Sequence, residues 1–484
     1  MIDHDLIQKQ LEEMLRLHKV PSVSVTIYNK GNYQHFSAGH KDMETSSSPD
    51  QDTLYAIGSC TKSFTAGAIG ILCDQGLLDL DDPVQKYIPE FQMYNSYAGI
   101  HLTVRDMLCH RCGLPRHELA WYPWLDQFTE SDIIRIFRYL EPNQPFRYKM
   151  QYQNLMYALA GFVISRVSGM PWADFIEKYL IAPLDFGQAA YDADDLLSSA
   201  NHAKGYRLKK TSGRNEEVAY ATLGAMNAAG SMGLGSRQLA MWNVLLMHEG
   251  NMDGRQIISQ KMVREMTSPQ MLVSDPVAAP LDGSLSMQSY GLGLFVENYR
   301  GHTVIQHSGH IDGFIADQCF VPSEDFACTV LTNSESPYGA RAIRFCLLDA
   351  MLGLEAKPWI KDLADFYHRT IKSWESAEET VSDPAYPCPV SLEKICGQYE
   401  NPGYGPITVT AKDDLLSVKL GTLTLKGRHC RGQYFIFTED HVLTGERLEG
   451  QIDLNIAGDV IGIGIKLDSA SEKPVYFKNT VHVP

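Results

Sequence analysis

The sequence predicts an α+β protein: an antiparallel sheet flanked by helices, with an inserted all-helical subdomain, followed by a C-terminal all-β, barrel-like domain. Three observations predict it. Strand patterns occur at both ends of residues 1–372, a mostly helical pattern fills about 64–200 between them, and short strand patterns return over 392–484. An acidic, proline-rich stretch over 373–391 has the composition of a linker between the two parts.

The first elements are a helix and a pair of strands. Apolar side chains recur at a helical spacing over 3–18, and Pro21 ends that helix. Apolar residues then alternate over 22–28, which predicts a strand with one buried face, and 33–38 has the pattern of its hairpin partner. The chain is therefore expected to begin with one helix and two strands of the sheet.

Strand patterns return beyond the helical region, at 290–296, 303–306, 314–321 and 326–331. A helical pattern over 339–352 follows them. Because the early and late strands both need partners, the economical arrangement is one antiparallel sheet built from both, with the helical subdomain inserted between them.

The C-terminal part consists of short strand patterns separated by Gly, Asn and Asp. They cover residues 407–411, 416–420, 422–425, 434–437, 447–455 and 460–467. Successive strands without intervening helices predict a small antiparallel barrel or sandwich.

The composition is that of a globular protein and argues against several partners. Hydrophobic residues make up 44% and charged residues 21%, which sets aside disordered and fibrous classes. The formal net charge is −16, because 58 acidic residues outnumber 42 basic ones. Such a chain repels a phosphate backbone unless a basic patch intervenes, and no Lys/Arg run exceeds Lys209-Lys210. We therefore expect no nucleic-acid partner.

The N-terminus lacks the pattern of a signal peptide, and no run of about eighteen apolar residues occurs. We expect no membrane partner and a cytoplasmic location, unless a leader was removed beforehand. The ten cysteines then favour buried small side chains over a disulfide framework. Cys109 and Cys112 are spaced like a metal pair, but a structural zinc site needs a second pair nearby. Packing is the favoured interpretation, and we expect no cofactor.

The first candidate catalytic pair is Ser59 and Lys62. Gly58 permits a tight turn before the helix expected at 66–78, so Ser59 should lie at a helix N-terminus, where N–H groups favour a developing oxyanion. Lys62 shares its helix face. A serine hydroxyl needs a base, and a desolvated lysine can serve. Taken alone, the spacing also fits a serine that caps a helix.

The second candidate is Tyr152-Gln-Asn154, which precedes an apolar helix expected at 155–167. A phenol beside an ammonium can shuttle a proton to a leaving group. The amide of Asn154 can hold Lys62 and donate to a substrate carbonyl. Taken alone, an asparagine helix cap beside a packing tyrosine explains the pattern equally simply.

The third candidate is His307-Ser308-Gly309, at the expected end of a strand. Glycine lets a substrate backbone approach the strand edge, and the N–H of His310 can pair with that of Ser59 as an oxyanion hole. His307 can assist proton transfer or bind a substrate carboxylate. A histidine on a strand is, taken alone, also explained by packing.

Together the three motifs resemble the penicillin-recognising serine hydrolases, a group that holds DD-peptidases, class C β-lactamases, esterases and D-aminopeptidases. The segments at 102–115, 227–236 and 290–293 are similar to further motifs of that family. Residues 397–405 resemble the start of a lipocalin-like domain appended to some of these hydrolases. The resemblance implies a β-lactamase/transpeptidase-like fold and an acyl-enzyme mechanism. Its implied catalytic residues are Ser59, Lys62 and Tyr152, and its implied substrate or oxyanion residues are Asn154, His307, Ser308, Gly309 and His310.

Position 307 departs from part of this family, because β-lactamases and most DD-peptidases have lysine there. Histidine is typical of the peptidase, amidase and esterase branch, and with an ordinary pKa it holds a carboxylate only partly at pH 7. We therefore expect a serine peptidase or amidase that cleaves amide bonds of small or D-amino-acid-containing peptides. The alternatives are a carboxylesterase or weak β-lactamase of the same fold, and a catalytically silent penicillin-binding-like sensor.

An aromatic cluster follows the 102–115 motif, at Trp121, Tyr122 and Trp124. Such a cluster can form a substrate lid, or it can simply pack the helical insertion. The expected partner is a small-molecule or short-peptide substrate, and the sequence leaves the oligomeric state open, a homo-oligomer included.

Overall fold

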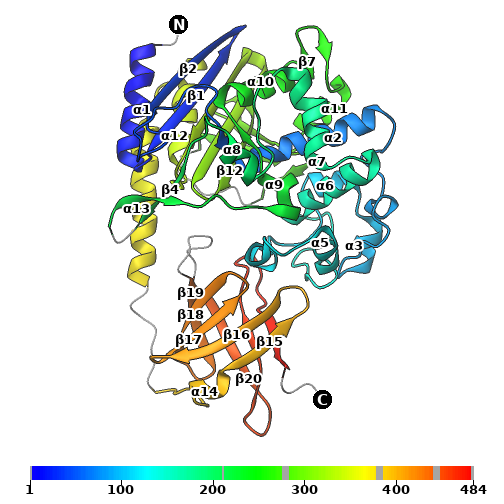
Figure 1. Cartoon of the computed structure of the whole chain (residues 1–484), viewed down its shortest axis with the longest axis vertical. Coiled ribbons are helices and arrows are strands. Elements are labelled where there is room, and N and C mark those ends of the chain that lie inside the picture. Colours follow the sequence, from blue (N-terminus) through cyan, green and yellow to red (C-terminus); the bar gives the residue numbers. More distant parts are fainter. Residues whose placement is uncertain (1–2, 210–211, 275–282, 378–384, 440–446, 481–484) are drawn as a thin grey trace. The chain divides into compact units, whose positions relative to one another are not determined.

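The computed structural model describes residues 3–209, 212–274, 283–377, 385–439 and 447–480 (Figure 1). Its contacts divide the chain into two compact units. The first, called the sheet unit below, comprises Met1–Pro89, Leu102–Arg111 and Asn154–Ile371. The second, called the barrel unit, comprises Glu90–His101, Cys112–Gln153 and Lys372–Pro484.

The sheet unit is built on one eight-stranded antiparallel sheet, in the order β2-β1-β14-β13-β12-β11-β10-β9. The predicted union of early and late strands is confirmed, because β1 pairs with β14 from Val23↔Thr332 to Asn29↔Phe326. The strands are β1 (Ser22–Asn29), β2 (Asn32–Gly39), β9 (Met271–Leu272), β10 (Leu285–Tyr290), β11 (Phe295–Tyr299), β12 (His302–Ile311), β13 (Phe314–Val321) and β14 (Phe326–Thr332).

Helices cover both faces of this sheet. On one face α1 (His4–His18) and α12 (Gly339–Met351) pack against β1, β13 and β14 in a shared apolar core (Figure 1). On the other face lies α10 (Ser236–Met247). The prediction of one buried face for β1 was wrong, because α10 covers the polar face as well and Ser236 Oγ lies 2.9 Å from Ser24 Oγ and 2.8 Å from Thr26 Oγ1.

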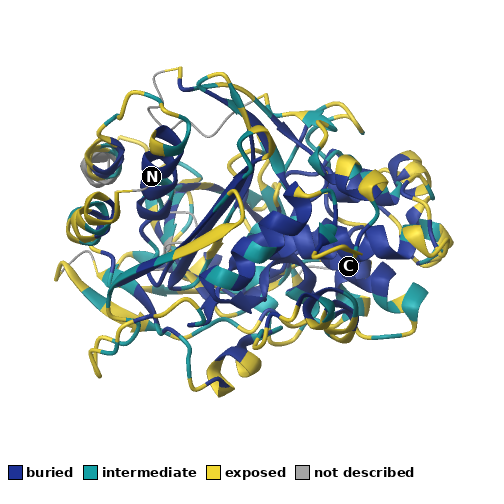
Figure 2. Cartoon of the chain, turned by 90° about the horizontal axis from the view of Figure 1, so that it is seen from above, coloured by how far each residue is buried: buried dark blue, intermediate teal, exposed yellow. Residues whose placement is uncertain are grey.

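Two helices of the sheet unit are buried over most of their length, α2 (Thr61–Asp74) and α6 (Asn154–Ser168), and dark-blue helices mark the interior in Figure 2. The helix predicted at 66–78 corresponds to α2, which begins five residues earlier, at Thr61, and ends four residues earlier, at Asp74. It begins earlier because the 3₁₀ turn η1 (Gly58–Cys60) leads directly into it, and it ends where Gly76 adopts a left-handed φ of 70°. Further helices of this unit are α4 (Val104–Leu108), α7 (Trp172–Ile176), α8 (Ala193–Ser198), α9 (Asn227–Gly230), α11 (Gln260–Thr267) and the part of α13 (Trp359–Ala377) up to Ile371.

Two strand predictions near the sheet centre also change. Residues 290–296 do not form one strand, because the chain turns at Gly291, whose N–H donates to Leu294 O (2.8 Å), and β10 and β11 lie on either side of that turn. The strand predicted at 303–306 extends to Ile311 as β12, so His307 and Gly309 lie within it and not after it.

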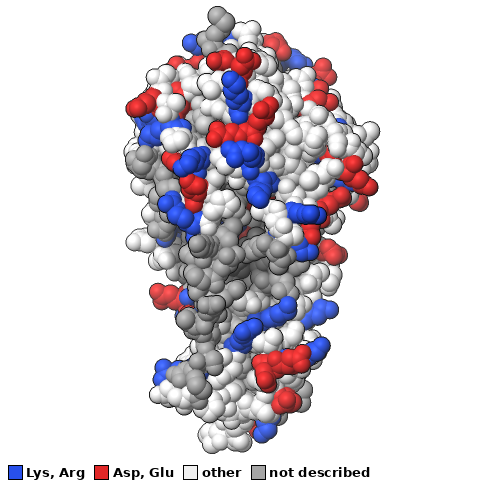
Figure 3. Space-filling model, turned by 90° about the vertical axis from the view of Figure 1, so that its left-hand side faces the viewer, with Lys and Arg blue, Asp and Glu red and all other residues white. Residues whose placement is uncertain are grey.

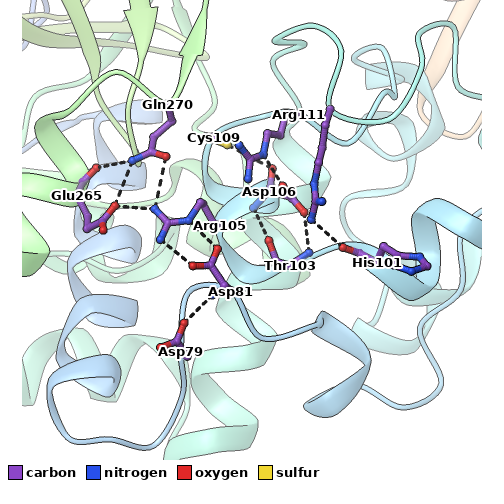
Figure 4. A network of polar contacts seen from close by, with 11 residues as sticks. Asp79, Asp81, His101, Thr103, Arg105, Asp106, Cys109, Arg111, Glu265 and Gln270 are labelled. Carbon is purple, nitrogen blue, oxygen red and sulfur yellow. Dashed lines mark hydrogen bonds and ion pairs between the residues drawn. The ribbon is translucent and has the colours of Figure 1, made fainter.

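A polar network on α4 joins distant segments of the sheet unit (Figure 4). The Arg105 guanidinium contacts Asp81 (2.8 Å), in the loop that follows α2, and Glu265 (2.6 Å), on α11. Thr103 and Asp106 form a reciprocal capping box at the start of the same helix. These contacts fix the short helix that carries the 102–115 motif.

The C-terminal part is a closed barrel of eight antiparallel strands, which confirms the predicted β domain. The strands are β15 (Gly397–Asn401), β16 (Gly405–Lys412), β17 (Leu415–Leu420), β18 (Leu423–Arg431), β19 (Tyr434–Glu439), β20 (Leu448–Leu454), β21 (Val460–Ile465) and β22 (Val475–Asn479). Sequence patterns missed β15 and β22, since each has one fully buried aromatic side chain, Tyr399 and Phe477, among more exposed residues. A short helix, α14 (Leu392–Ile395), precedes the barrel.

The barrel unit also contains two segments from the helical region. Residues 90–101 include α3 (Ser96–His101), and residues 112–153 include α5 (Glu130–Ile136) and the 3₁₀ turns η3 (Glu118–Ala120) and η4 (Tyr122–Trp124). The predicted linker at 373–391 begins within α13, which continues to Ala377, and its residues 378–384 lie outside the described part of the chain. The domain boundaries placed at that linker remain a prediction.

Acidic and basic side chains are interspersed on the face drawn in Figure 3. Among the described residues, no helix combines the length and the apolar character that crossing a bilayer requires.

Candidate active site

Ser59 lies in the 3₁₀ turn that opens α2, and Lys62 lies on the first turn of that helix. The Lys62 ammonium donates to Ser59 Oγ at 2.9 Å and to the carbonyl of Ala229 at 2.6 Å. The Lys62 side chain is fully buried, whereas Ser59 is half-buried between the buried residues Gly58 and Cys60. A half-buried serine hydroxyl and a fully buried lysine amine are therefore in direct contact.

Strand β12 approaches this turn closely enough to exclude side chains from both backbones. A Cβ atom at position 309 would lie 1.8 Å from Ile57 O and 3.0 Å from Ser59 N, and one at position 58 would lie 2.8 Å from His310 N. The backbone nitrogens of Ser59 and His310 thus flank one close glycine–glycine contact. The pairing of these two N–H groups as an oxyanion hole, in which both would face one developing charge, remains a prediction.

The same stretch of β12 has a strand on one side only, within the described pairings. Its residues from Ile305 to Ile311 pair with β13, but β11 pairs only as far as Gln306. Ser308 is half-buried and His310 is exposed. The edge at 307–311 is therefore suited to an extended backbone that lies beside Ser59.

His307 is buried among aromatic rings, and its two ring nitrogens have specific partners. Nδ1 donates to Ser308 O at 2.7 Å, so Nε2 accepts from the Tyr290 hydroxyl at 3.0 Å. Burial, assisted by the nearby charge of Lys62, lowers the pKa of His307 to about 3. His307 is therefore neutral at pH 7 and supplies no positive charge for a substrate carboxylate.

The Tyr152 motif straddles the two compact units. Asn154 is the first residue of α6, a helix that packs against α2. Tyr152 lies in the barrel unit, where it is half-buried and the Arg116 guanidinium carbon lies 5.0 Å from its ring centroid. The apolar helix predicted at 155–167 is confirmed, with α6 spanning Asn154–Ser168.

The family model described as Beta-lactamase matches residues 7–349, about seven tenths of the chain. The chain belongs to the Beta-lactamase family. It has the β-lactamase fold and a C-terminal eight-stranded barrel, and the relatives found by comparison include hydrolases and amidases.

Two curated relatives match over most of their length. An unguisins hydrolase of Aspergillus campestris is 26% identical over 84% of this chain and 78% of its own. An unguisins hydrolase of Aspergillus violaceofuscus is 24% identical over 97% of this chain and 89% of its own.

Two solved structures share the fold at low identity. An octameric penicillin-binding protein homologue from Pyrococcus abyssi covers 99% of this chain and all of its own, with 21% identity and a TM-score of 0.64. A D-amino acid amidase from Ochrobactrum anthropi complexed with L-phenylalanine amide covers 72% of this chain and 97% of its own, with 24% identity and a TM-score of 0.59.

Sequence reasoning missed several residues around the site of this Beta-lactamase family member. Tyr290 contacts His307, the Ala229 carbonyl accepts from Lys62, and the Lys62 ammonium lies 5.4 Å from the Tyr157 ring centroid. Ala229 and Tyr290 lie inside the 227–236 and 290–293 segments, so motif similarity marked their neighbourhoods but gave no side chain a role. No sequence signal connects Arg116 with Tyr152.

The predicted lid residues lie in the barrel unit, around η4. Trp121 is buried, and Tyr122 and Trp124 are half-buried. The indole N–H of Trp124 donates to Tyr404 O at 3.0 Å, and the Thr422 N–H donates to Pro123 O at 3.0 Å. This aromatic segment thus rests on the barrel, and its role as a lid remains a prediction.

Cys109 and Cys112 are both buried, and burial raises the pKa of the Cys109 thiol to about 12. A protonated thiol is a poor metal ligand and a poor nucleophile. Across the described ranges, no group of three or more His, Cys, Asp or Glu side chains is placed to hold a metal ion.

Proposed function

We propose that this protein is a serine amidase or peptidase that forms an acyl-enzyme on Ser59. The observation that carries the proposal is the 2.9 Å contact between Lys62 Nζ and Ser59 Oγ, made by a fully buried lysine at the start of a buried helix. This contact places the amine where it can take the hydroxyl proton once it is in its neutral form.

The proposed reaction begins when Lys62 takes the Ser59 hydroxyl proton and Oγ attacks the substrate carbonyl carbon. The tetrahedral oxyanion lies between the backbone N–H groups of Ser59 and His310. Tyr152 passes a proton to the leaving nitrogen, and Asn154 holds Lys62 and the substrate carbonyl. Water then attacks the acyl carbon along the reverse path and frees Ser59.

Amides of small or D-configured amino acids and short peptides containing them are the proposed substrates. The edge of β12 at 307–311 offers main-chain hydrogen bonds to an extended backbone. Neutral His307 lacks the full charge that would hold the carboxylate of a β-lactam. The D-amino acid amidase among the similar structures supports amide cleavage over ester cleavage.

A steady-state assay tests this proposal. D- and L-amino acid p-nitroanilides are compared with the matching p-nitrophenyl esters and with a chromogenic β-lactam, using wild-type protein and Ser59→Ala. We expect D-anilide turnover that exceeds β-lactam turnover and falls by at least about 1,000-fold in Ser59→Ala. An unchanged rate in that variant would show that Ser59 is not the nucleophile. Hydrolysis of esters alone would favour the carboxylesterase alternative.

A further inference from the structure

Tyr152 lies in an irregular stretch just before α6, and both of its neighbours in sequence are hydrogen-bonded to other parts of the barrel unit. The fully buried Gln153 donates its side-chain N–H to Pro115 O at 2.6 Å. Gln151 Nε2 donates to Asn143 Oδ1 at 2.5 Å. Together with the Arg116 guanidinium over its ring, these contacts place Tyr152 relative to the 115–118 segment and to Asn143.

The 115–118 segment is itself clamped at His117, which is buried in a left-handed backbone conformation (φ +47°). Its ring Nε2 donates to Glu141 O at 3.0 Å, so its Nδ1 accepts from the Tyr404 hydroxyl at 2.7 Å. Its backbone N–H donates to Asp468 Oδ2 at 2.8 Å. Three hydrogen bonds to a buried residue in an uncommon backbone conformation specify one position of the segment.

Two of these partners belong to the barrel. Tyr404 precedes β16 and Asp468 follows β21, and both side chains are buried. Ala470, two residues after Asp468, contacts the residue that holds Gln151: Asn143 Nδ2 donates to Ala470 O at 2.6 Å. This contact is called the Asn143 tie below. The barrel therefore contacts the segment before Tyr152 at two separate places, His117 and Asn143.

Two barrel glycines allow the chain at Pro123 and Trp124, between His117 and Tyr152, to approach the barrel closely. A Cβ atom on Gly405 would lie 2.8 Å from the Trp124 ring, and one on Gly421 would lie 2.2 Å from Pro123 O. Both glycines have a positive φ, which other residues rarely adopt. A side chain at either glycine would thus clash with Pro123 or Trp124, so the close contact requires glycine at both positions.

We propose that the C-terminal barrel positions Tyr152 within the barrel unit, through the His117–Tyr404–Asp468 clamp and the Asn143 tie. His117 and Tyr404 are positioning residues, since they act through Tyr152 and touch no reacting atom. This inference rests on the proposed role of Tyr152 in proton transfer. It gives the barrel a part in turnover although no barrel residue takes part in the chemistry.

A mutant cycle tests this inference in the full-length chain. Tyr404→Phe removes one hydroxyl and keeps the ring, so the clamp loses the donor to His117. We expect kcat to fall about tenfold with little change in KM, since a small displacement of a catalytic group slows the chemical step. In a Tyr152→Phe background the same change should lower kcat less than twofold, because the group it positions is already absent.

Tyr399→Phe is the matched control, because the Tyr399 hydroxyl is also buried in the barrel and donates to Ile395 O at 2.7 Å, within the C-terminal part of the chain. We expect near-wild-type kcat for it, with a loss of thermal stability like that of Tyr404→Phe. Asn143→Ala, at a half-buried position, cuts the second tie and should lower kcat even if Tyr404→Phe fails to fold.

The outcomes separate this inference from the proposed function. Equal losses of kcat in the wild-type and Tyr152→Phe backgrounds, or equal effects of Tyr404→Phe and Tyr399→Phe, would overturn the positioning role. Wild-type kcat in Tyr152→Phe itself would overturn the proposed role of Tyr152. A large loss in Tyr152→Phe with none in Tyr404→Phe and Asn143→Ala would overturn the inference alone.

Discussion

Lys62 and His307 are both buried basic side chains near Ser59, yet their surroundings give them different tasks. Lys62 donates to Ser59 Oγ and to a backbone carbonyl, whereas His307 accepts from Tyr290 and donates to Ser308 O. The lysine is therefore placed to exchange a proton with the nucleophile. The histidine is neutral, and two hydrogen bonds hold its ring in place.

The low pKa of His307 predicts an acid-sensitive fold. An unfolded histidine binds a proton near pH 6.5, but folded His307 resists one until about pH 3, so the unfolded state takes up more protons between these values. The contribution of His307 to the free energy of unfolding is fully present above pH 6.5 and is lost as pH falls toward 3. His18 and His117 are shifted downward by burial as well and add to the same trend.

Denaturant unfolding at pH 7.5, 6 and 5 measures this effect. We expect the free energy of unfolding to fall with pH, and His307→Gln to make that fall less steep. A slope identical in wild type and His307→Gln would contradict the assignment of a neutral, buried His307.

At the residue scale, the sequence predicts the contact between Ser59 and Lys62, the proposed nucleophile and base, because its geometry is local. Ser59 and Lys62 lie three positions apart, and helical geometry then places them on one face. The partners of His307 are not local in this way. Tyr290 belongs to β10, which is separated from β12 by β11, so the hydrogen bond depends on the whole sheet register.

At the scale of elements, the contact between β12 and the turn before α2 is the most constrained feature of the site. Gly309→Ala would place a methyl group 1.8 Å from Ile57 O. We expect strand and turn to separate, with a loss of stability of about 1–3 kcal/mol. The backbone nitrogens of Ser59 and His310, which we propose as the oxyanion hole, should move apart with them, and we expect kcat to fall by about 100-fold.

Gly70→Ala, in α2, is the matched control for that substitution. Its added methyl group would lie at an ordinary 3.4 Å from Met262 Cβ, and alanine favours a helix interior over glycine by up to about 1 kcal/mol. Thermal unfolding and kcat together give the comparison. Wild-type kcat in Gly309→Ala would mean that the two backbones need not touch for catalysis.

A second element-scale prediction concerns the ion cluster that joins α12 to the sheet. Buried Arg344 lies 3.4 Å from Glu297 on β11 and 3.2 Å from Asp317 on β13. Arg344→Met would leave two buried carboxylates without the cation that contacts them and should cost about 3–5 kcal/mol of unfolding free energy. The exposed pair Lys361–Asp365 is the control, and Lys361→Met should hardly change stability. Similar losses in both variants would contradict this account.

The strand errors have a common physical cause. Leu292 and Leu294 continue the apolar alternation of β10 through a turn, so a pattern rule extends the strand over Gly291 and Gly293. In β1 the residues facing α10 are serine and threonine, which look solvent-exposed in sequence but are buried by hydrogen bonding to Ser236. Local pattern predicts which elements exist, but not what covers them.

At the scale of the whole molecule, each of the two compact units has an apolar core of its own. We expect calorimetry to resolve two unfolding transitions, because each unit can unfold as a cooperative body. Ile463→Ala, in the barrel core, should lower one transition temperature, and Val330→Ala, in the sheet core, the other. A single transition that shifts equally in both variants would show that the units unfold as one.

The composition of the barrel unit could not be predicted from sequence patterns. A linker-like composition at 373–391 places the visible boundary there, yet residues 112–153 pack with the barrel. Contacts such as His117 N to Asp468 Oδ2 join residues 351 positions apart and leave no periodic signal. The barrel fold itself was predictable, because alternating strands are a local pattern.

The central claim, that Ser59 is a nucleophile activated by Lys62, is tested most directly by labelling with a fluorophosphonate followed by peptide mass mapping. We predict one adduct, on Ser59, that forms at least about 100-fold more slowly in folded Lys62→Ala and is absent in Ser59→Ala. An adduct on another residue, or folded wild-type protein that stays unlabelled under conditions where a known serine hydrolase reacts, would contradict it.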